Sequence, residues 1–339
     1  SFPTRRSSDL CVRLVREDIQ MAKLLTEYQD NEHIDTFTLI KSADVRLTKT
    51  GKTYLSLVFS DRSGDLPGNL WDATEIQINT LIPGTIVKIQ GVRGAYQDKP
   101  QIQITSIRVS ESGEPSNPAD FMTHAPIKED VMRDELADIM LMITNPVWNR
   151  LLRKLFSAAQ DAFLRFPAAK MNHHAFAGGL AFHSLSIARL AQNIAAQYPQ
   201  INKELLLTGA LLHDLGKTIE LSGPVATQYT VEGNLIGHIV LIDEQIVLAA
   251  NELHFDLHSE DMVVLRHVVL AHHGLLEYGS PVRPALLEAE VLHQLDELDA
   301  SIQMVTSALE KTEENNFSER VFGLDNRRFY RSHYNVIDK

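Results

Sequence analysis

The spacing of the apolar residues changes once along the chain, and this change constrains the fold more than any other feature. Between 35 and 109 the apolar residues mostly alternate with polar ones, as in YLSLVF at 54–59, which is typical of β-strands. From 127 to about 313 they recur at helical intervals, as in LLRKLFSAA at 151–159. The 339 residues suffice for two buried cores. We therefore predict a multidomain protein with an N-terminal all-β domain and a C-terminal all-α domain.

Turn residues divide the alternating stretch into about five strands, the number that an OB-fold barrel requires. The turns are expected at TGK (50–52), DRSG (61–64), PG (83–84) and DKP (98–100). The OB-fold, as a nucleic-acid-binding domain, is predicted to occupy 33–109.

The rest of the chain divides by composition. Residues 110–126 (SESGEPSNPADFMTHAP) are rich in Ser, Gly and Pro and are predicted to be an interdomain linker. The helical domain is expected at 127–313 and a C-terminal tail at 314–339. Residues 1–32 form an N-terminal segment, and its opening SFPTRRSSDL could be a sequence-assembly scar rather than native sequence.

Charge and cysteine content narrow the functional classes. The formal net charge of -12 argues against general affinity for nucleic acid, yet 33–109 holds nine Lys/Arg and seven acidic residues and is slightly basic. The single cysteine, Cys11, excludes an internal disulfide. No apolar run is long enough to cross a membrane. We expect a soluble, cytoplasmic protein, and its repeated apolar helix faces permit a homo-oligomer.

Histidine and aspartate residues recur in the helical domain in the order H, HD, H, HH, D. Each member is flanked by apolar helical sequence, and the HD and HH pairs precede glycines that end helices. Adjacent residues on a helix diverge, so a pair reaches one ion only near a helix end. The members are His183, His213, Asp214, His238, His272, His273 and Asp296.

These residue types favour a pair of divalent transition-metal ions. Neutral imidazoles and a shared carboxylate suit Mn, Fe, Co or Zn better than Mg or Ca. Two ions roughly 3.5 to 4 Å apart can generate hydroxide and clamp phosphoryl oxygens. Lys217 and Arg283 are candidates for binding phosphate oxygens, with Lys217 preferred. Asp299 lies one turn after Asp296 and stays open as an alternative final ligand.

This order of residues resembles the dinuclear branch of the HD-domain superfamily of metal-dependent phosphohydrolases. The resemblance implies that Asp214 bridges two ions and acts in catalysis together with Lys217. The implied ligands of the first ion are His183, His213, Asp214 and Asp296, and those of the second are Asp214, His238, His272 and His273.

The whole chain from about 35 to about 305 resembles the YhaM family of 3'-to-5' exoribonucleases. The resemblance is carried by an OB-fold before GGLAFH, LLHDLGK, ELSGP, YTVEGNLIGHI, HHG, EYGSPVRP and EAEVLH. It implies hydrolysis of single-stranded RNA from the 3' end to 5'-mononucleotides, activity on single-stranded DNA in some members, and a preference for Mn²⁺. In the barrel, Trp71 and Tyr96 are candidates for stacking on bases, with a place in the core as the alternative.

Other functions stay open from the sequence. The same site could hydrolyse small nucleotides, with the β domain in a regulatory or oligomerising role. A His-rich dinuclear site could also hold iron and activate oxygen, or the domain could be an inactive binding module. The tail from 317 mixes arginines with aromatic residues and could dock RNA, although packing on its own domain is preferred.

Overall fold

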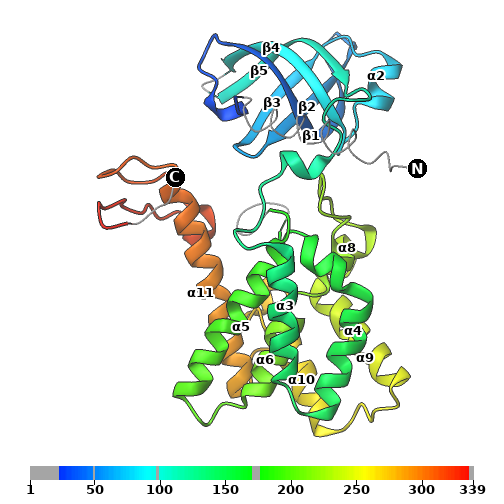
Figure 1. The fold of residues 1–339 in the computed structure, drawn as a ribbon, viewed down its shortest axis with the longest axis vertical. Helices are drawn as coiled ribbons and strands as arrows, with labels where there is room; N and C mark the ends of the chain where they lie inside the picture. Colours follow the sequence, from blue (N-terminus) through cyan, green and yellow to red (C-terminus); the bar gives the residue numbers. More distant parts are fainter. Residues whose placement is uncertain (1–22, 49, 97–98, 170–175, 336–339) are drawn as a thin grey trace, which may run out of the picture. The chain divides into compact units, whose positions relative to one another are not determined.

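The structure is a computed structural model, and it describes residues 23–48, 50–96, 99–169 and 176–335. The chain forms two compact units (Figure 1). The first comprises residues 1–123 with 225–227, and the second comprises 124–224 with 228–339. The first unit is built of strands and the second of helices, which confirms the predicted fold class.

The first unit is a closed five-stranded barrel. Its strands follow the order β1-β2-β3-β5-β4, and β4 pairs with β1 to close it. The β3–β5 pair is parallel and the other pairs are antiparallel. This is the arrangement of an OB-like barrel, and the predicted number of strands is confirmed. The strands are β1 (His33–Leu47), β2 (Thr53–Asp61), β3 (Gly64–Leu70), β4 (Ile86–Tyr96) and β5 (Lys99–Val109).

Strand β1 is long because it pairs with two neighbours in succession. Its first half pairs with β4 from His33 to Leu39, and its second half pairs with β2 from Leu39 to Leu47. The register shifts between Ile40 and Ser42, and such a bulge bends a strand and increases its twist. The bend lets one strand close the barrel.

The barrel core comes from the alternation seen in the sequence. Leu55, Leu57 and Phe59 of β2 are buried, with half-buried residues between them. Leu25, in the short helix η1 (Leu25–Glu27), is buried in the same core, and its backbone N–H donates to the Asp61 carboxylate at 2.6 Å. The barrel therefore begins upstream of residue 33.

A short helix, α2 (Glu75–Thr80), lies between β3 and β4, and the sequence analysis did not predict it. Thr74 caps it: the hydroxyl accepts from the Gln77 N–H, and the Gln77 side chain accepts from the Thr74 N–H. This reciprocal capping box has the sequence signature T-x-x-Q. The capping-box signature is therefore present in the sequence, but the helix that it begins has only six residues.

The segment predicted to be a linker is folded onto the barrel for most of its length. Arg108 of β5 forms a two-pronged ion pair with Glu114, at 2.6 and 2.7 Å. Phe121, in the helix η2 (Pro118–Phe121), is buried against Leu39 and Ile86. Composition alone could not show this, because one ion pair and one aromatic residue fix an otherwise polar stretch.

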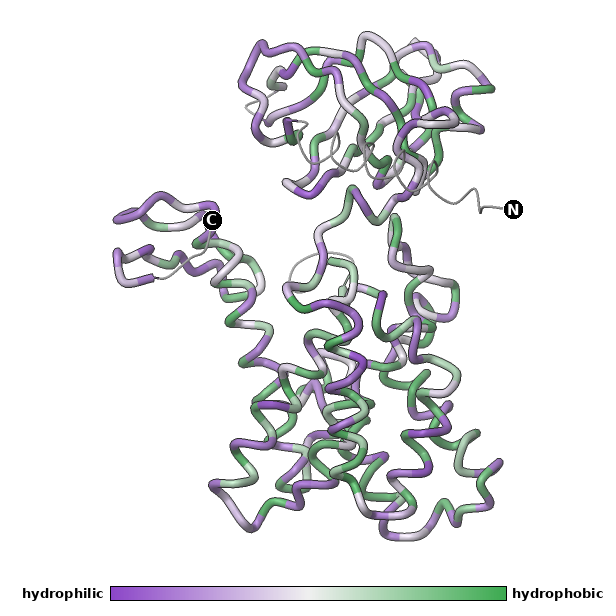
Figure 2. Tube along the Cα trace, viewed as in Figure 1, coloured by the Kyte–Doolittle hydropathy of each residue, from purple (hydrophilic) through white to green (hydrophobic). Residues whose placement is uncertain are grey.

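The second unit packs its helices around α5, which contacts α4, α6 and α11. Every residue of α6 from Leu205 to Leu212 is buried, as expected for a helix that is apolar on all sides. Buried apolar residues of these helices form one core, and Figure 2 shows apolar and polar residues interspersed along them. Its helices are α3 (Glu129–Leu141), α4 (Pro146–Arg165), α5 (Gly179–Gln197), α6 (Lys203–Leu212), α7 (Lys217–Glu220), α8 (Val231–Leu235), α9 (His238–Glu252), α10 (Glu260–Leu270), η3 (Leu276–Tyr278), α11 (Leu287–Glu310) and η4 (Phe322–Leu324).

The described part of the tail packs on the end of α11. Arg331 donates hydrogen bonds to the carbonyl oxygens of Leu309 and Thr312, in the last turn of that helix and just after it. Bridges join Phe317 to Tyr330 and Val321 to Arg327, so the tail doubles back on itself. None of the helices in the described ranges has both the length and the apolar character that crossing a bilayer requires.

Replacement of Phe59 by Ala should destabilise the barrel by about 3 to 5 kcal/mol, because Phe59 is fully buried and a cavity would remain. The chain has two tryptophans, Trp71 in the barrel and Trp148 in the helical unit. In a Trp148→Phe background, fluorescence of Trp71 during urea unfolding therefore reports on the barrel. Ile76→Ala, at an exposed position of α2, is the control and should change stability by less than about 0.5 kcal/mol. Equal effects of the two changes would contradict this core assignment.

Candidate metal centre

Helix ends and helix faces of the second unit bring the predicted ligand residues together. Donor atoms of six of the seven predicted ligands form two overlapping groups, in each of which all atoms lie within 4.8 Å of one another, and Asp296 belongs to neither group. Asp214 belongs to both groups. One group holds His183, His213 and Asp214, and the other holds Asp214, His238, His272 and His273.

The HD pair points inward because it lies where α6 ends. His213, still in a helical conformation, is the C-cap of α6, and Asp214 follows it in the turn before α7. A Cβ atom at Gly216 would overlap the carbonyl of His238, the first residue of α9. Glycine at 216 therefore allows the turn after Asp214 to approach the start of α9.

The HH pair follows α10 in a turn whose glycine, unlike Gly216, has a left-handed conformation. Gly274 has a φ of 72°, in the left-handed region that favours glycine. A Cβ atom there would overlap the His293 ring of α11, and Nδ1 of that ring lies 3.1 Å from the carbonyl oxygen of His272. His293 thus holds the turn that carries the pair.

Hydrogen bonds at Nδ1 fix which nitrogen of each imidazole faces the cluster. Nδ1 lies 3.0 Å from the Ala210 carbonyl in His213, 2.7 Å from the Val269 carbonyl in His272, and 2.7 Å from the Tyr278 carbonyl in His273. A carbonyl oxygen only accepts, so Nδ1 must donate and Nε2 keeps its lone pair in the neutral ring.

The atoms that face the interior of the cluster lack partners. In the described ranges, Nε2 of His213, His238 and His272 and Oδ1 of Asp214 are buried without a hydrogen-bond partner. Buried polar atoms are rarely left in this way, and four converging acceptors cannot satisfy one another. A divalent cation would satisfy all of them, so the residues present fit a metal site.

The two oxygens of Asp214 face different histidines. Oδ2 lies 3.4 Å from Nε2 of His213 and 3.7 Å from Nε2 of His183. Oδ1 lies 3.3 Å from Nε2 of His238 and 3.8 Å from Nε2 of His272. This is the arrangement that a carboxylate bridging two ions would need.

Asp296 and Asp299 lie on opposite sides of the His183 ring. Oδ1 of Asp296 is 3.0 Å from Nε2, the nitrogen that faces the cluster. Oδ2 of Asp299 is 2.7 Å from Nδ1, on the other side. The geometry favours Asp296 as a ligand and gives Asp299 the orienting position of a carboxylate behind a metal-bound histidine.

Glu220 has the same position behind His238, and the sequence analysis did not single it out. Its Oε1 accepts from the backbone N–H of His238 at 3.1 Å and lies 3.2 Å from Nδ1 of that ring. The residue ends α7, directly after the HDLGK motif. It is the first residue of the ELSGP motif, but the motif does not reveal its contact with His238, because that contact depends on how α7 meets α9.

The charges at the centre of the site are held in their ionised forms. Burial would raise the pKa of Asp214, but the Lys217 ammonium, at 2.7 Å from Oδ2, and the surrounding histidines hold it well below its ordinary value. Burial would lower the pKa of Lys217, and the same carboxylate raises it above its ordinary value. Lys217 therefore stays a cation although its side chain is only 12% exposed.

The pKa values of the histidines differ because their neighbouring residues differ. Burial lowers the pKa of His272 well below its ordinary value, and the adjacent His273 and His213 lower it further, so this ring is neutral and ready to ligate. Burial would also lower the pKa of His183, but Asp296 and Asp299 outweigh it and raise the pKa to about 9. A cation bound at Nε2 would take the place of that proton.

The other predicted site residues lie outside this cluster. Arg283 is exposed on the loop between η3 and α11, and no described contact joins it to the ligand residues. Trp71 and Tyr96 are 60% and 65% exposed on the barrel, at the ends of β3 and β4. Trp71 lies beside Tyr54, with ring centroids 4.7 Å apart.

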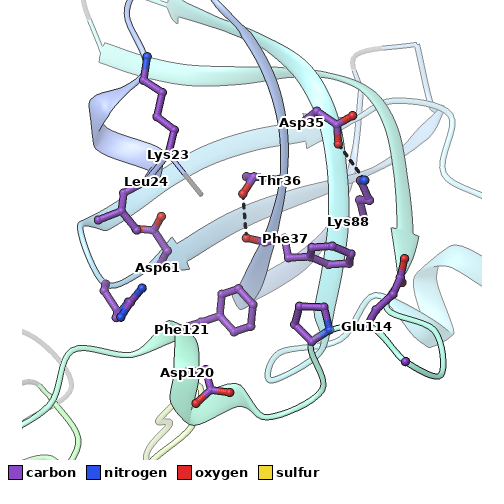
Figure 3. A pocket seen from close by; sticks show the side chains of 13 residues that line it. Lys23, Leu24, Asp35, Thr36, Phe37, Asp61, Lys88, Glu114, Asp120 and Phe121 are labelled. Carbon is purple, nitrogen blue, oxygen red and sulfur yellow. Dashed lines mark hydrogen bonds and ion pairs between the residues drawn. The ribbon is translucent and has the colours of Figure 1, made fainter. Parts of the chain in front are cut away.

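The barrel unit also contains a pocket of about 320 Å³ that is separate from these residues (Figure 3). Phe37 and Phe121 form its apolar wall, and the Lys88 ammonium lies 3.2 Å from the Asp35 carboxylate at its edge. Neither the exposed aromatic pair nor any histidine of the cluster lines it. Its polar groups already pair within the barrel, so it holds no comparable set of unsatisfied atoms.

Asp299→Asn and Glu220→Gln should each weaken metal binding by about 10- to 100-fold, because they remove carboxylates that orient ligand histidines. The measurement is titration of the metal-free protein with Mn²⁺ by calorimetry, with circular dichroism to verify folding. Glu310→Gln, at the exposed last position of α11, is the matched control. Affinities equal to the control's in folded Asp299→Asn and Glu220→Gln proteins would disprove the orienting role.

Comparisons with known proteins agree with this site. Residues 180–301 match the family model for the HD domain, and all seven predicted ligand residues fall within them. A chain of "Structure and Conformational Change of a Replication Protein A Heterotrimer Bound to ssDNA" is similar over 29% of this chain and 78% of that chain, with 15% identity and a TM-score of 0.19. The barrel assignment rests on its own strand pairing. The helical unit therefore contains an HD domain, which indicates a metal-dependent hydrolase of phosphoester bonds, and this domain follows an OB-like barrel.

Proposed function

We propose that the protein is a metal-dependent 3'-to-5' exonuclease of single-stranded RNA, with single-stranded DNA as a second substrate and 5'-mononucleotides as products. The observation that carries the hydrolytic part is the convergence of four buried, partnerless ligand atoms around Asp214. The substrate is inferred from the exposed aromatic residues of the barrel and from the resemblance to the YhaM family.

The proposed ligands follow the two faces of Asp214. His183, His213, Asp214 and Asp296 would hold one ion, and Asp214, His238, His272 and His273 the other. Manganese is our proposal for the native metal, and iron, cobalt and zinc share its preference for imidazole and carboxylate. When bound, the ions would lower the pKa of water and neutralise charge on phosphoryl oxygens.

Lys217 is proposed to bind the substrate phosphate. Its ammonium has three donors, of which one reaches Oδ2 of Asp214. The contact holds the side chain at the cluster, and the raised pKa keeps it charged. A second donor can then bind a nonbridging phosphate oxygen, where charge increases during hydrolysis. Arg283 remains a proposed phosphate contact from the exposed loop.

The barrel would bind the single strand by stacking. The side chains of Trp71 and Tyr96 are exposed. Lys52 forms a 3.0 Å ion pair with Asp72, the residue that follows Trp71 in the chain. Stacking accepts any base, which suits an enzyme that removes successive nucleotides. We expect these residues to affect long substrates only.

Hydrolysis of small nucleotides is the second candidate function. It is favoured by one observation, that the whole ligand set lies within the helical unit. A small phosphodiester such as bis(p-nitrophenyl) phosphate then needs nothing from the barrel. The two functions differ in their response to changes in Trp71 and Tyr96.

The first test is a time course on 5'-labelled single-stranded RNA with Mn²⁺, for the wild type and Asp214→Asn. We expect a ladder that shortens from the 3' end for the wild type, and a rate at least about 100-fold lower for the variant, because both ions lose a shared ligand. Intact RNA with a fully metal-loaded wild type would reject the exonuclease in favour of the small-nucleotide hydrolase.

Trp71→Ala should weaken binding of a single-stranded oligonucleotide by about 5- to 150-fold, since one stacked base contributes roughly 1 to 3 kcal/mol. Hydrolysis of bis(p-nitrophenyl) phosphate should stay unchanged. Fluorescence anisotropy with a labelled RNA measures the affinity, and Ile76→Ala on the exposed face of α2 is the control. An unchanged affinity would remove Trp71 from the binding surface.

A further inference from the structure

We propose that the C-terminal arm, defined as residues 315–335, is a second binding surface for single-stranded nucleic acid. The proposal rests on the proposed function for the class of substrate. The arm belongs to the helical unit and follows α11, the helix that carries Asp296.

The arm is a preorganised structure. Ser318 and Phe329 are joined by a backbone hydrogen bond of 2.8 Å, and the Ser318 hydroxyl accepts a second hydrogen bond from the Phe329 N–H at 3.0 Å. Ser318 and Leu324 are buried. Arg331 fixes the arm to the end of α11 through carbonyl oxygens. A surface that is already ordered loses little conformational entropy on binding.

The arm holds four arginines against two acidic residues, Glu319 and Asp325, so its net charge is +2. Its four arginines make no ion pair within the described ranges, whereas Arg189 and Arg266 of the same unit bind carboxylates through two contacts each. They donate instead to backbone carbonyls, which are neutral acceptors and leave the cationic charge in place. The four are Arg320, Arg327, Arg328 and Arg331, in a chain whose net charge is -12.

Aromatic rings alternate with these arginines. Phe322 is 87% exposed, and Phe317, Tyr330 and Tyr334 are also exposed. The Arg328 guanidinium lies 5.7 Å from the Phe317 ring, and that ring lies 5.2 Å from the Tyr330 ring. Planar cations beside open rings are the combination that binds bases by stacking and phosphates by charge.

A nucleic-acid partner explains this surface better than a second copy of the chain. The buried centre of a protein interface is depleted of charge. In the arm Leu324 is buried and Val321 is half-buried, while three of the four arginines, Arg320, Arg327 and Arg328, are exposed. A partner rich in negative charge and flat rings matches that pattern.

The position of the arm suits a strand whose end is being hydrolysed. Helix α11 runs from Asp296 in the cluster to Glu310 just before the arm, about 20 Å at 1.5 Å per residue. Both places belong to one packed unit (Figure 1). A strand of several nucleotides could therefore contact the arm while its end lies at the cluster, and a dinucleotide could not.

The test compares a double variant of the arm with a matched control. Arg320→Gln with Phe322→Ala removes one charge and one exposed ring, and Gln can still donate to the Asn326 carbonyl. Lys203→Gln with Tyr198→Ala removes the same groups at the turn between α5 and α6, at the opposite end of the helical unit (Figure 1). Both are made in the full chain carrying Asp214→Asn, so that bound RNA is not degraded.

Binding of a fluorescein-labelled 20-nucleotide RNA is followed by anisotropy over a range of salt concentrations. We expect the arm variant to bind about 5- to 150-fold more weakly than its parent, and its slope of log affinity against log salt to fall by about 0.7. The control should match the parent. With Asp214 restored, both variants should hydrolyse bis(p-nitrophenyl) phosphate at the wild-type rate.

Other outcomes separate this proposal from the proposed function. Equal RNA affinity for the arm variant and the control overturns the arm. A change of molar mass by light scattering with unchanged RNA affinity also overturns it and assigns the surface to a second copy. Weaker binding by the arm variant, with a wild type that binds RNA but does not shorten it, supports the arm and rejects the exonuclease. A parent that binds no RNA overturns both.

Discussion

One buried carboxylate, that of Asp214, determines how the helical unit is arranged around its site. A carboxylate removed from water is costly unless cations or donors surround it. Among the described residues Lys217 pairs with it directly as a cation, whereas Nε2 of His213, His238 and His272 lie beside it without a hydrogen-bond partner. The cluster is therefore incomplete as a purely protein structure, and the bound cation proposed for it would complete the charge balance.

The fold supplies this cluster with residues by ending helices at it. His213 and His272 each follow an apolar helix, and each ring donates from Nδ1 to a carbonyl three residues earlier. Each ring thus satisfies one of the carbonyls that a helix end leaves open, while its other nitrogen faces the cluster. Packing of α6 in the core fixes where that end lies. The packing of the core therefore also determines where the ligand side chains lie in this unit.

The sequence predicted most of this because the relevant signals were local. Apolar spacing separates barrel from helices, and the glycines after Asp214 and His273 mark the turns that free each pair. The role of Glu220 could not be predicted, since it arises from the meeting of two helices. For the same reason the proposal of Asp296 rather than Asp299 as a ligand rests on the orientation of the His183 ring, which the sequence does not encode. The fold of the segment after β5 depended on Glu114 reaching Arg108, which composition does not encode.

The hydrogen bonds at Nδ1 of the ligand histidines differ in how they respond to mutation. Nδ1 of His213, His272 and His273 is hydrogen-bonded to main-chain carbonyl oxygens. Every amino acid supplies a carbonyl oxygen, so substitution of the accepting residue leaves the hydrogen bond intact. His183 and His238 are held by carboxylate side chains, which a single codon change can remove. Each proposed ion site thus contains at least one histidine whose Nδ1 hydrogen bond survives mutation of its acceptor and one histidine whose Nδ1 hydrogen bond a mutation can remove. Variation at those two carboxylates offers evolution a way to tune metal affinity without disturbing the fold.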